Sequence, residues 1–586
     1  MLPFRSIRCV RASASGMLAL GVLAFGPGAA GEEPSLESPP EHWLAVRAEE
    51  PWVVFFDTAG GPEEASGLDR RFDLWDVAPG GERVWALVSE REWRDLRSEG
   101  YEPRLDEEQT RTLEGLGERL ALQGGGIPGF PCYRTVEETL ATGAALAADH
   151  PSLATWIDVG DSWLKTQDPS SGFDLFVLKL TQSAVPGPKP IFFANFAIHA
   201  REYATAELGT RFAEWLVAGY GGDPNITWLL DHHEVHLMLQ SNPDGRVEAE
   251  AGAFWRKNVN NAHCPDTSDR GVDLNRNFDF QWGCCGGSSG FDCSTVYRGP
   301  LAGSEPEIMA QQAYVRSIFP DQRGPGLDDP APADATGVAI DVHSFSELVL
   351  WPWGFTTADS PNAAAFRTLG RKLAFFNGYR PIPIHDLTIA DGSSADFYYG
   401  ELGVAGLAFE IGTTFFQSCS FFESDLLEPN LEALLFAAKS ARAPFLEPSG
   451  PEALDVTVTP STVEAGALVQ LTATVDDSRF STAEGVEPSQ TIALAEAFVG
   501  APPGAAGAAP QAMAATDGTY DETLEAVALT LETAGLAPGR HLVFVRGSDA
   551  GGREGVVSAA FLEIEDSLFR DDFESGGTGA WAQTVP

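Results

Sequence analysis

Short apolar runs alternate with longer amphipathic segments through the middle of the chain, from about residue 127 to residue 444. The short runs have the length and the β-branched or aromatic content of buried strands, as in IFFANFAIH, HEVHLMLQSN, GVAIDVH and GLAFEI. Apolar residues at helical spacing occur in the longer segment EYATAELGTRFAEWLVAGY. Strands that alternate with helices are typical of an α/β domain, so we predict a central sheet that is flanked by helices.

The segments on either side of this region have different patterns. Before it, the strand-like runs WVVFF and RVWALV precede the helix-like EREWRDLRSEGY, which predicts a small α+β unit. A charged stretch that ends in three glycines, at positions 124–126, is typical of an exposed linker. Beyond residue 448, period-two stretches such as LVQLTATVDD and HLVFVRGSDA predict a β-sandwich of the immunoglobulin type.

These changes of pattern divide the chain into five parts. In residues 1–31, Arg5, Arg8 and Arg11 precede an apolar run over 17–25 and several small residues, which is the pattern of a secretory signal peptide. The other parts are the α+β unit with its linker at 32–126, the α/β domain at 127–447, the β-sandwich at 448–566 and an acidic, Gly-rich tail at 567–586. No further run of about 20 apolar residues follows, so we expect a secreted protein without a transmembrane segment.

Net charge and cysteine content narrow the class of protein. The formal net charge is -46 at pH 7, and binding to a phosphate backbone needs dense Lys and Arg, so we expect no nucleic-acid partner. Once Cys9 leaves with the signal, the remaining cysteines enter an oxidising compartment that favours disulfides, and their pairing is left open by the sequence. A zinc site built from cysteines is the alternative, but the sequence has no pair of CxxC motifs.

Two predicted strand ends carry residues that can bind a metal ion. IFFANFAIHAREYATAE places His199 at the end of one strand and Glu202 at the start of a helix, and GVAIDVHSF places His343 at the end of another strand. Two imidazoles and a carboxylate leave one position of a catalytic zinc open for water, and strand ends gather at one edge of an α/β sheet. The alternative is two partly buried core histidines. Asp341 is either a partner of His343 or a solvated bystander.

A carboxylate and several basic residues lie near the same motifs. Glu410 ends the strand in GLAFEIGT, where it could act as a general base, and a structural ion pair with arginine is the alternative. Basic residues are scarce overall, yet Arg201, Arg256 and Arg276 are close to these motifs in the sequence. Arginine binds carboxylates in a bidentate manner and stabilises a developing oxyanion, so we predict a site that binds a carboxylate. Ordinary surface arginines are the other explanation.

The ordered set of motifs resembles the zinc carboxypeptidases of the carboxypeptidase A and B type, and within them the bacterial carboxypeptidase T branch. The matching segments are IPGFPCYRTVEE, HARE, SNPDG, WRKN, DLNRNF, WGCCGGSSG, YRGP, IDVHSF and FEIGT. The resemblance implies a mixed central sheet and one Zn2+ per chain, with His199, Glu202 and His343 as ligands. It also implies that Glu410 is the general base and acid and that Arg256 polarises the carbonyl group during hydrolysis of the C-terminal peptide bond.

The same resemblance assigns the parts around this centre. Asn275 and Arg276 match the pair that holds the terminal carboxylate of the peptide or protein substrate, and Arg201 matches an accessory arginine. The segment before Ile127 takes the place of an inhibitory propeptide, so we expect a zymogen that an activating protease cuts between about residues 106 and 127. The sequence does not specify the natural substrate, the oligomeric state, or whether structural Ca2+ is bound.

Specificity follows from the positions that would line the pocket for the last side chain of the substrate. An ungapped comparison from Glu410 places Ala395 and Ala408 in this pocket. Small apolar side chains leave the charge of a buried Lys or Arg uncompensated, so we predict a preference for apolar C-terminal residues. Three carboxylates nearby would change this preference if they pointed inward: Asp391, Asp396 and Glu401.

One departure from the family pattern and two alternative functions complete the hypothesis. Thr388 occupies the position of the family's mobile tyrosine, and the nearest phenols in the sequence are Tyr398 and Tyr399. The first alternative function is a catalytically inactive surface protein that binds peptide or carbohydrate, which would be expected to lack a metal ligand or the base. The second is an adhesion protein whose function resides in the C-terminal β-domain.

Overall fold

The computed structural model describes residues 39–40, 43, 46–47, 51–78, 80–113, 125–264 and 268–565. The predicted signal peptide, most of the Gly-rich linker and the acidic tail lie outside these residues. Among the residues that the structure describes, no helix combines the length and the apolar character needed to span a bilayer.

An eight-stranded mixed sheet forms the centre of the molecule, in the order β11-β10-β12-β9-β7-β8-β6-β5. Its strands are β5 (Ala154–Asp161), β6 (Asp174–Leu180), β7 (Ile191–Phe196), β8 (Glu234–Met238), β9 (Val338–His343), β10 (Leu348–Trp351), β11 (Arg380–Pro383) and β12 (Ala405–Glu410). β9 pairs in parallel with both β7 and β12 and is buried along its whole length. The predicted strands β7, β8, β9 and β12 and the α/β class are therefore confirmed.

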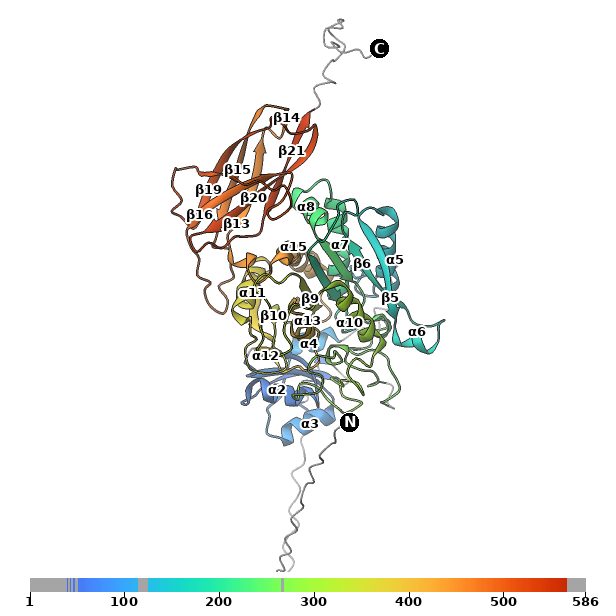
Figure 1. The fold of residues 1–586 in the computed structure, drawn as a ribbon. Coiled ribbons are helices and arrows are strands. Elements are labelled where there is room, and N and C mark those ends of the chain that lie inside the picture. Colours follow the sequence, from blue (N-terminus) through green and yellow to red (C-terminus); the bar gives the residue numbers. More distant parts are fainter. Residues whose placement is uncertain are drawn as a thin grey trace, which may run out of the picture.

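Helices cover both faces of this sheet (Figure 1). They are α5 (Val136–Asp149), α6 (Trp163–Gln167), α7 (Tyr203–Gly219), α8 (Pro224–His232), α9 (Pro243–Glu250), α10 (Pro306–Ile318), α11 (Ala363–Asn377), α12 (Ile384–Leu387), α13 (Ser394–Leu402) and α15 (Leu427–Lys439). Alternate residues of β7 enter different cores, because Phe192 packs with residues of α7, α11 and α15 and Phe193 packs with residues of α10 and α13. The sheet is thus buried on both faces, as parallel strands require.

A small α+β unit precedes the central domain. Its four-stranded sheet has the order β2-β3-β1-β4, with β1 (Trp52–Asp57), β2 (Asp73–Val77), β3 (Arg83–Val88) and β4 (Arg104–Leu105). The helices are α2 (Gly61–Asp69), α3 (Glu90–Ser98) and α4 (Glu107–Thr112), and a capping box of Ser89 and Glu92 begins α3. We call residues 51–113 the N-terminal unit; Figure 1 shows it at one end of the molecule.

Two further sheets lie at the opposite end of the molecule (Figure 1). Their orders are β13-β15-β19-β18 and β14-β21-β20-β16-β17. The strands are β13 (Glu452–Thr459), β14 (Thr462–Glu464), β15 (Leu468–Asp476), β16 (Ile492–Val499), β17 (Gln511–Ala512), β18 (Ala514–Ala515), β19 (Leu524–Glu532), β20 (Gly539–Asp549) and β21 (Ser558–Glu565). Alternating residues of both sheets share one hydrophobic core, so we call residues 452–565 the two-sheet unit.

Three disulfides pair the six cysteines that follow the predicted signal. They join Cys132 to Cys419, Cys264 to Cys293, and the adjacent Cys284 and Cys285. The first links the segment before α5 to the segment after β12, across 287 residues of sequence. The prediction of disulfides is confirmed, and the alternative of a cysteine zinc site is wrong because every one of these sulfurs is oxidised.

Candidate active site

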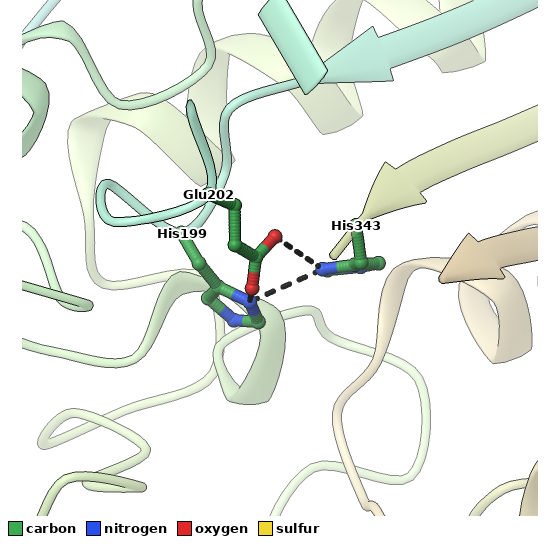
Figure 2. Close-up of side chains that lie close together, drawn as sticks. All are labelled: His199, Glu202 and His343. Atoms are coloured by element: carbon green, nitrogen blue, oxygen red, sulfur yellow. Dashed lines mark hydrogen bonds and ion pairs between the residues drawn. The ribbon is translucent and has the colours of Figure 1, made fainter. Parts of the chain in front are cut away.

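Two neighbouring parallel strands bring together the three predicted metal ligands. β7 ends at Phe196, and the chain then turns so that His199 and Glu202 lie just before α7. His343 is the last residue of β9. Because β7 and β9 are adjacent and parallel, their carboxyl ends meet at one edge of the sheet. Figure 2 shows the three side chains pointing toward one another from these two positions.

The ligand atoms of these residues converge in a buried position. Glu202 Oε1 lies 2.8 Å from His199 Nδ1, and Glu202 Oε2 lies 3.3 Å from His343 Nδ1. The two Nδ1 atoms are 3.1 Å apart, and the three residues form a group whose ligand atoms all lie within 4.8 Å of one another. Each residue exposes 3% or less of its surface. Burial alone would also fit the alternative of two core histidines, but the convergence of both rings on Glu202 favours a metal site.

Two further carboxylates hold the outer nitrogens of both imidazole rings. His199 Nε2 lies 3.1 Å from Asp273 Oδ1, and His343 Nε2 lies 2.9 Å from Asp341 Oδ2. An ionised carboxylate only accepts hydrogen bonds, so each ring donates from Nε2 and directs a lone pair at Nδ1 toward the centre. Asp341 is fully buried, so the alternative that it is a solvated bystander is wrong.

The electrostatics of this cluster favour positive charge at its centre. Although burial opposes ionisation, His199 and His343 hold the pKa of Glu202 below its ordinary value. Burial likewise disfavours a charged His343, yet Asp341 and Glu202 raise its pKa well above the ordinary value. Either a proton on His343 or a metal cation at the centre supplies this positive charge, and a metal cation requires both imidazoles in their neutral form, with a lone pair at each Nδ1. The donor set of two imidazoles and one carboxylate therefore fits a zinc ion.

Glu410 lies beside this cluster because β12 and β9 pair in parallel, with Glu410 opposite His343 in the register. It lines the same cavity as the three ligand residues, and burial raises the pKa of its carboxyl group to about 8. Among the described residues, no lysine or arginine lies within ion-pair distance of it. The alternative of a structural Glu–Arg ion pair is therefore wrong.

Arg256, Asn275 and Arg276 line the same cavity as Glu410. Arg256 donates from Nε and Nη2 to Asp273 Oδ2 at 3.1 and 3.0 Å, so the buried Asp273 contacts both His199 and Arg256. Arg276 donates from Nε to the carbonyl oxygen of Gly287 at 2.9 Å. These bonds fix the direction of both guanidinium groups.

An apolar chamber extends from these polar groups within the same cavity of about 130 Å3. Ala395 and Ala408 line it, as the sequence predicted, and other small or aliphatic residues complete its wall: Leu350, Ile384, Leu387 and Ala390. Thr388 also lines the cavity. The chamber lies at the carboxyl end of β12, next to the predicted base.

The three carboxylates that would have changed the predicted specificity have hydrogen-bond or ion-pair partners outside the cavity. Asp391 accepts hydrogen bonds from the backbone N–H groups of Cys285 and Gly287. Asp396 accepts hydrogen bonds from the backbone of residues 354 and 355, and Glu401 pairs with Arg316. None of the three lines the cavity.

Neither Tyr398 nor Tyr399 takes the place of the family's mobile tyrosine, whose position is occupied by Thr388 in this chain. The hydroxyl of Tyr398 donates to Asn195 Oδ1 at 2.7 Å, and that of Tyr399 donates to Asn362 Oδ1 at 2.6 Å. Both side chains are fully buried and do not line the cavity. Neither phenol therefore reaches the cavity of the proposed site.

The N-terminal unit covers the site. Asp69 at the end of α2 lies 3.9 Å from Arg276, and β2 contributes Leu74, Trp75 and Asp76 to the wall of the cavity. Arg201 does not line this cavity. It is 1% exposed, makes a bidentate ion pair with Asp73 at 2.8 and 3.0 Å, and faces a second, larger cavity beneath the N-terminal unit.

The sequence of this chain is similar to those of known proteins. A family model described as zinc carboxypeptidase matches residues 140–428. A zinc carboxypeptidase of Saccharothrix mutabilis subsp. capreolus is 31% identical over 422 residues, which cover 69% of this chain and 88% of that protein. The chain belongs to the zinc carboxypeptidase family. It is therefore a metallocarboxypeptidase, a hydrolase of peptide bonds.

Other zinc carboxypeptidases resemble the chain over a smaller part of its length. Carboxypeptidase A1 of Rattus norvegicus is 29% identical over 294 residues, which cover 49% of this chain and 64% of that protein. The crystal structure of carboxypeptidase A from Helicoverpa armigera superposes with a TM-score of 0.55 at 22% identity, covering 67% of this chain and 98% of that one. The likeness in structure confirms the mixed α/β fold of a carboxypeptidase.

Two features of this zinc carboxypeptidase were not singled out from its sequence. Asp273 belongs to the motif DLNRNF, two residues before Asn275, and its position in that motif was the available signal. Asp69 and Asp73 lie in the N-terminal unit, where no motif marks them. Their contacts with Arg276 and Arg201 depend on docking between two separate units.

Proposed function

We propose that the protein is a secreted carboxypeptidase that removes apolar residues from the C-termini of peptides and proteins. His199, Glu202 and His343 would hold one zinc ion, Glu410 would act as general base and acid, and a set of polar residues would bind the substrate: Arg201, Arg256, Asn275 and Arg276. The observation that carries the proposal is the convergence of the three ligand atoms beside Glu410, at the mouth of an apolar chamber.

Each residue then has a defined task in hydrolysis. Arg276 and Asn275 hold the terminal carboxylate, which makes the enzyme cut only the last peptide bond. Zinc, when bound, would polarise the scissile carbonyl and make water a stronger nucleophile at neutral pH. Glu410 takes a proton from the attacking water and returns it to the departing amine, and Arg256 stabilises the negative charge that develops on the carbonyl oxygen.

Preference for apolar residues rests on the chamber that Ala395 and Ala408 line. A Leu or Phe side chain that enters it gains about 25 cal/mol for each Å2 of apolar surface removed from water. A Lys or Arg would bury its charge without a partner, because Asp391, Asp396 and Glu401 are engaged elsewhere.

Latency rests on the contacts of the N-terminal unit. Its residues Asp69, Trp75 and Asp76 occupy part of the wall of the cavity, where a substrate would have to enter. Asp73 pairs with Arg201, so the accessory arginine is not free to bind substrate. Cleavage in the segment that links the N-terminal unit to the central domain would release these contacts and activate the enzyme.

Metal analysis and turnover of two variants test the proposed site. His343→Ala should lose stoichiometric zinc and activity, because one of three protein ligands is removed. Glu410→Gln should keep one zinc per chain and lose about 10²-fold or more in kcat, because the proton acceptor is missing. A zinc-loaded and fully active His343→Ala enzyme would contradict the ligand assignment. A fully active Glu410→Gln enzyme would contradict the base assignment.

A further inference from the structure

Two carboxylate oxygens in the two-sheet unit are buried without a hydrogen-bond partner. Asp477 directly follows β15, and Asp549 is the last residue of β20. Each residue is 2% exposed. Asp477 Oδ1 and Asp549 Oδ2 receive no hydrogen bond from any residue that the structure describes. Buried anionic oxygens of this kind are costly unless a cation or a donor satisfies them.

One short segment connects the two aspartates. The backbone N–H of Gln490 donates to Asp477 Oδ2, Ile492 pairs with Asp549 in the β-sheet, and between them Thr491 accepts a hydrogen bond from the N–H of Ala550 at 2.8 Å. Three consecutive residues therefore reach from one carboxylate to the backbone of the other. The proximity has an electrostatic effect: burial, together with the charge of Asp549, raises the pKa of Asp477 to about 6.

Two cationic side chains, those of Lys372 and Arg553, act on Asp477 electrostatically, but neither donates a hydrogen bond to Asp477 Oδ1 or Asp549 Oδ2. Lys372 of α11 donates to Glu452 Oε1 at 3.1 Å and lies over the ring of Phe480. The backbone N–H of Arg553 donates to Asp549 Oδ1 at 2.8 Å, which leaves Oδ2 open. A backbone N–H therefore fixes one oxygen of each aspartate, and the other oxygen has no hydrogen-bond donor among the described residues.

We propose that the two-sheet unit binds one Ca2+ ion through Asp477 Oδ1 and Asp549 Oδ2. Hard cations prefer carboxylate and carbonyl oxygens, and the two-sheet unit has no cysteine and a single histidine, His541, so the donors on offer are oxygens. This site is distinct from the proposed zinc site, whose cavity is lined by residues of the N-terminal unit and the central domain and by none of the two-sheet unit.

The ion would also stabilise the contact between the two-sheet unit and the central domain. The loop that begins at Asp477 runs to β16 and docks on α11. Within it, Glu487 pairs with Arg371 at 2.9 Å and accepts a hydrogen bond from Thr368 at 2.6 Å. An ion that binds Asp477 at the start of this loop and Asp549 beside its end restricts both ends of the segment that makes these contacts.

Calorimetric titration of the full-length, zinc-loaded protein with CaCl2 tests the site directly. The wild type should bind one Ca2+ with a Kd of about 10⁻⁴ M, and MgCl2 should bind more weakly. Asp477→Asn and Asp549→Asn should each weaken binding by about tenfold or more, because a neutral amide replaces a charged ligand. Asp517→Asn is the matched control, because Asp517 is an exposed aspartate of the same unit.

Thermal unfolding separates loss of the site from loss of the fold. Without calcium, the two Asn variants should unfold at the wild-type temperature or above, because each removes one buried charge. With millimolar CaCl2, only the wild type and Asp517→Asn should gain stability. Unchanged calcium affinity in Asp477→Asn and Asp549→Asn would overturn the proposal. A wild type that ignores calcium but loses stability as the pH rises through about 6 would also overturn it, and would indicate a proton shared by the two aspartates.

Discussion

Asp273 is a single residue that connects the proposed zinc ligand His199 with Arg256. One of its oxygens accepts from His199 and the other accepts from Arg256. Although burial opposes its ionisation, Arg256 and His199 hold the pKa of Asp273 well below its ordinary value. A single anionic side chain therefore orients a proposed zinc ligand and the proposed oxyanion-stabilising arginine together.

Replacing Asp273 by Asn should disturb both partners. We expect zinc affinity to fall by about 10- to 100-fold, because the amide no longer fixes the His199 ring. kcat/KM should fall further than zinc loss explains, because Arg256 also loses its anchor. Zinc competition with a chromogenic chelator and assays at saturating zinc would measure the two effects. Asp279→Asn, which removes an exposed carboxylate, is the control, and equal behaviour of the two variants would contradict this role.

Ala395 decides the expected specificity. Peptides that differ only in a terminal Leu or Arg should be cleaved faster with Leu by the wild type, because the chamber has no carboxylate. Ala395→Asp should shift the ratio of kcat/KM toward Arg by about tenfold or more. Ala364→Asp, on the exposed surface of α11, should leave the ratio unchanged. Faster cleavage of the Arg peptide by the wild type would mean that the chamber does not receive the terminal side chain.

β2 is the element that connects the N-terminal unit to the proposed site. Asp73 at its start pairs with Arg201, and the following residues reach the cavity wall. The alternating pattern of a strand explains this only in part, because β2 contains an irregularity between Leu74 and Asp76. Leu74, Trp75 and Asp76 can therefore all contribute to the same wall.

Latency can be tested at this element. The intact chain should hydrolyse peptides slowly, and cleavage between about residues 106 and 127 should raise its activity. Intact Asp73→Asn should show about tenfold more activity than the intact wild type, because Arg201 loses a bidentate, charged partner. After cleavage, both should be equally active. Asp57→Asn alters an exposed ion pair of the same unit and is the control. An intact wild type as active as the cleaved enzyme would refute latency.

The two-sheet unit is packed against the central domain over a polar and apolar interface. Lys372 is fully buried and pairs with Glu452 at 3.1 Å, and the rings of Trp228 and Phe544 lie 6.3 Å apart. Lys439 reaches Ser558 Oγ at 3.2 Å. Because the buried Lys372 of α11 has its ion-pair partner, Glu452, in β13, the two-sheet unit is fixed to the central domain.

Truncation after Pro448 should therefore destabilise the molecule without removing its chemistry. Loss of Glu452 leaves Lys372 without its ion pair and exposes apolar surface around Trp228, so we expect the unfolding temperature to fall on the order of 5 °C. Hydrolysis at low temperature should persist, because no residue of the two-sheet unit lines the cavity of the proposed site. Calorimetry and peptide assays measure both effects. Unchanged stability would favour an independent binding domain, as in the adhesion hypothesis.

The sequence alone predicted four strands of the central sheet and named the candidate site residues. Apolar runs of strand length marked β7, β9 and β12, because strands that are buried on both faces are mostly apolar. His199, His343 and Glu410 were recognisable because each is a polar residue at or just beyond the end of such a run. These features depend on the order of apolar and polar residues within short segments, so they can be predicted from one sequence.

Only the tertiary structure decided the relations between distant segments. Three relations of this kind depend on segments that are far apart in the sequence and meet only through packing. They are the pairing of the six cysteines, the contact of Asp273 with both His199 and Arg256, and the hydrogen bonds that hold Asp391 away from the cavity. The open oxygens of Asp477 and Asp549 also escape the sequence, because aspartates at strand ends usually face solvent. Burial and hydrogen-bond partners are properties of the packed chain, so the same residue type can be structural in one place and part of a proposed site in another.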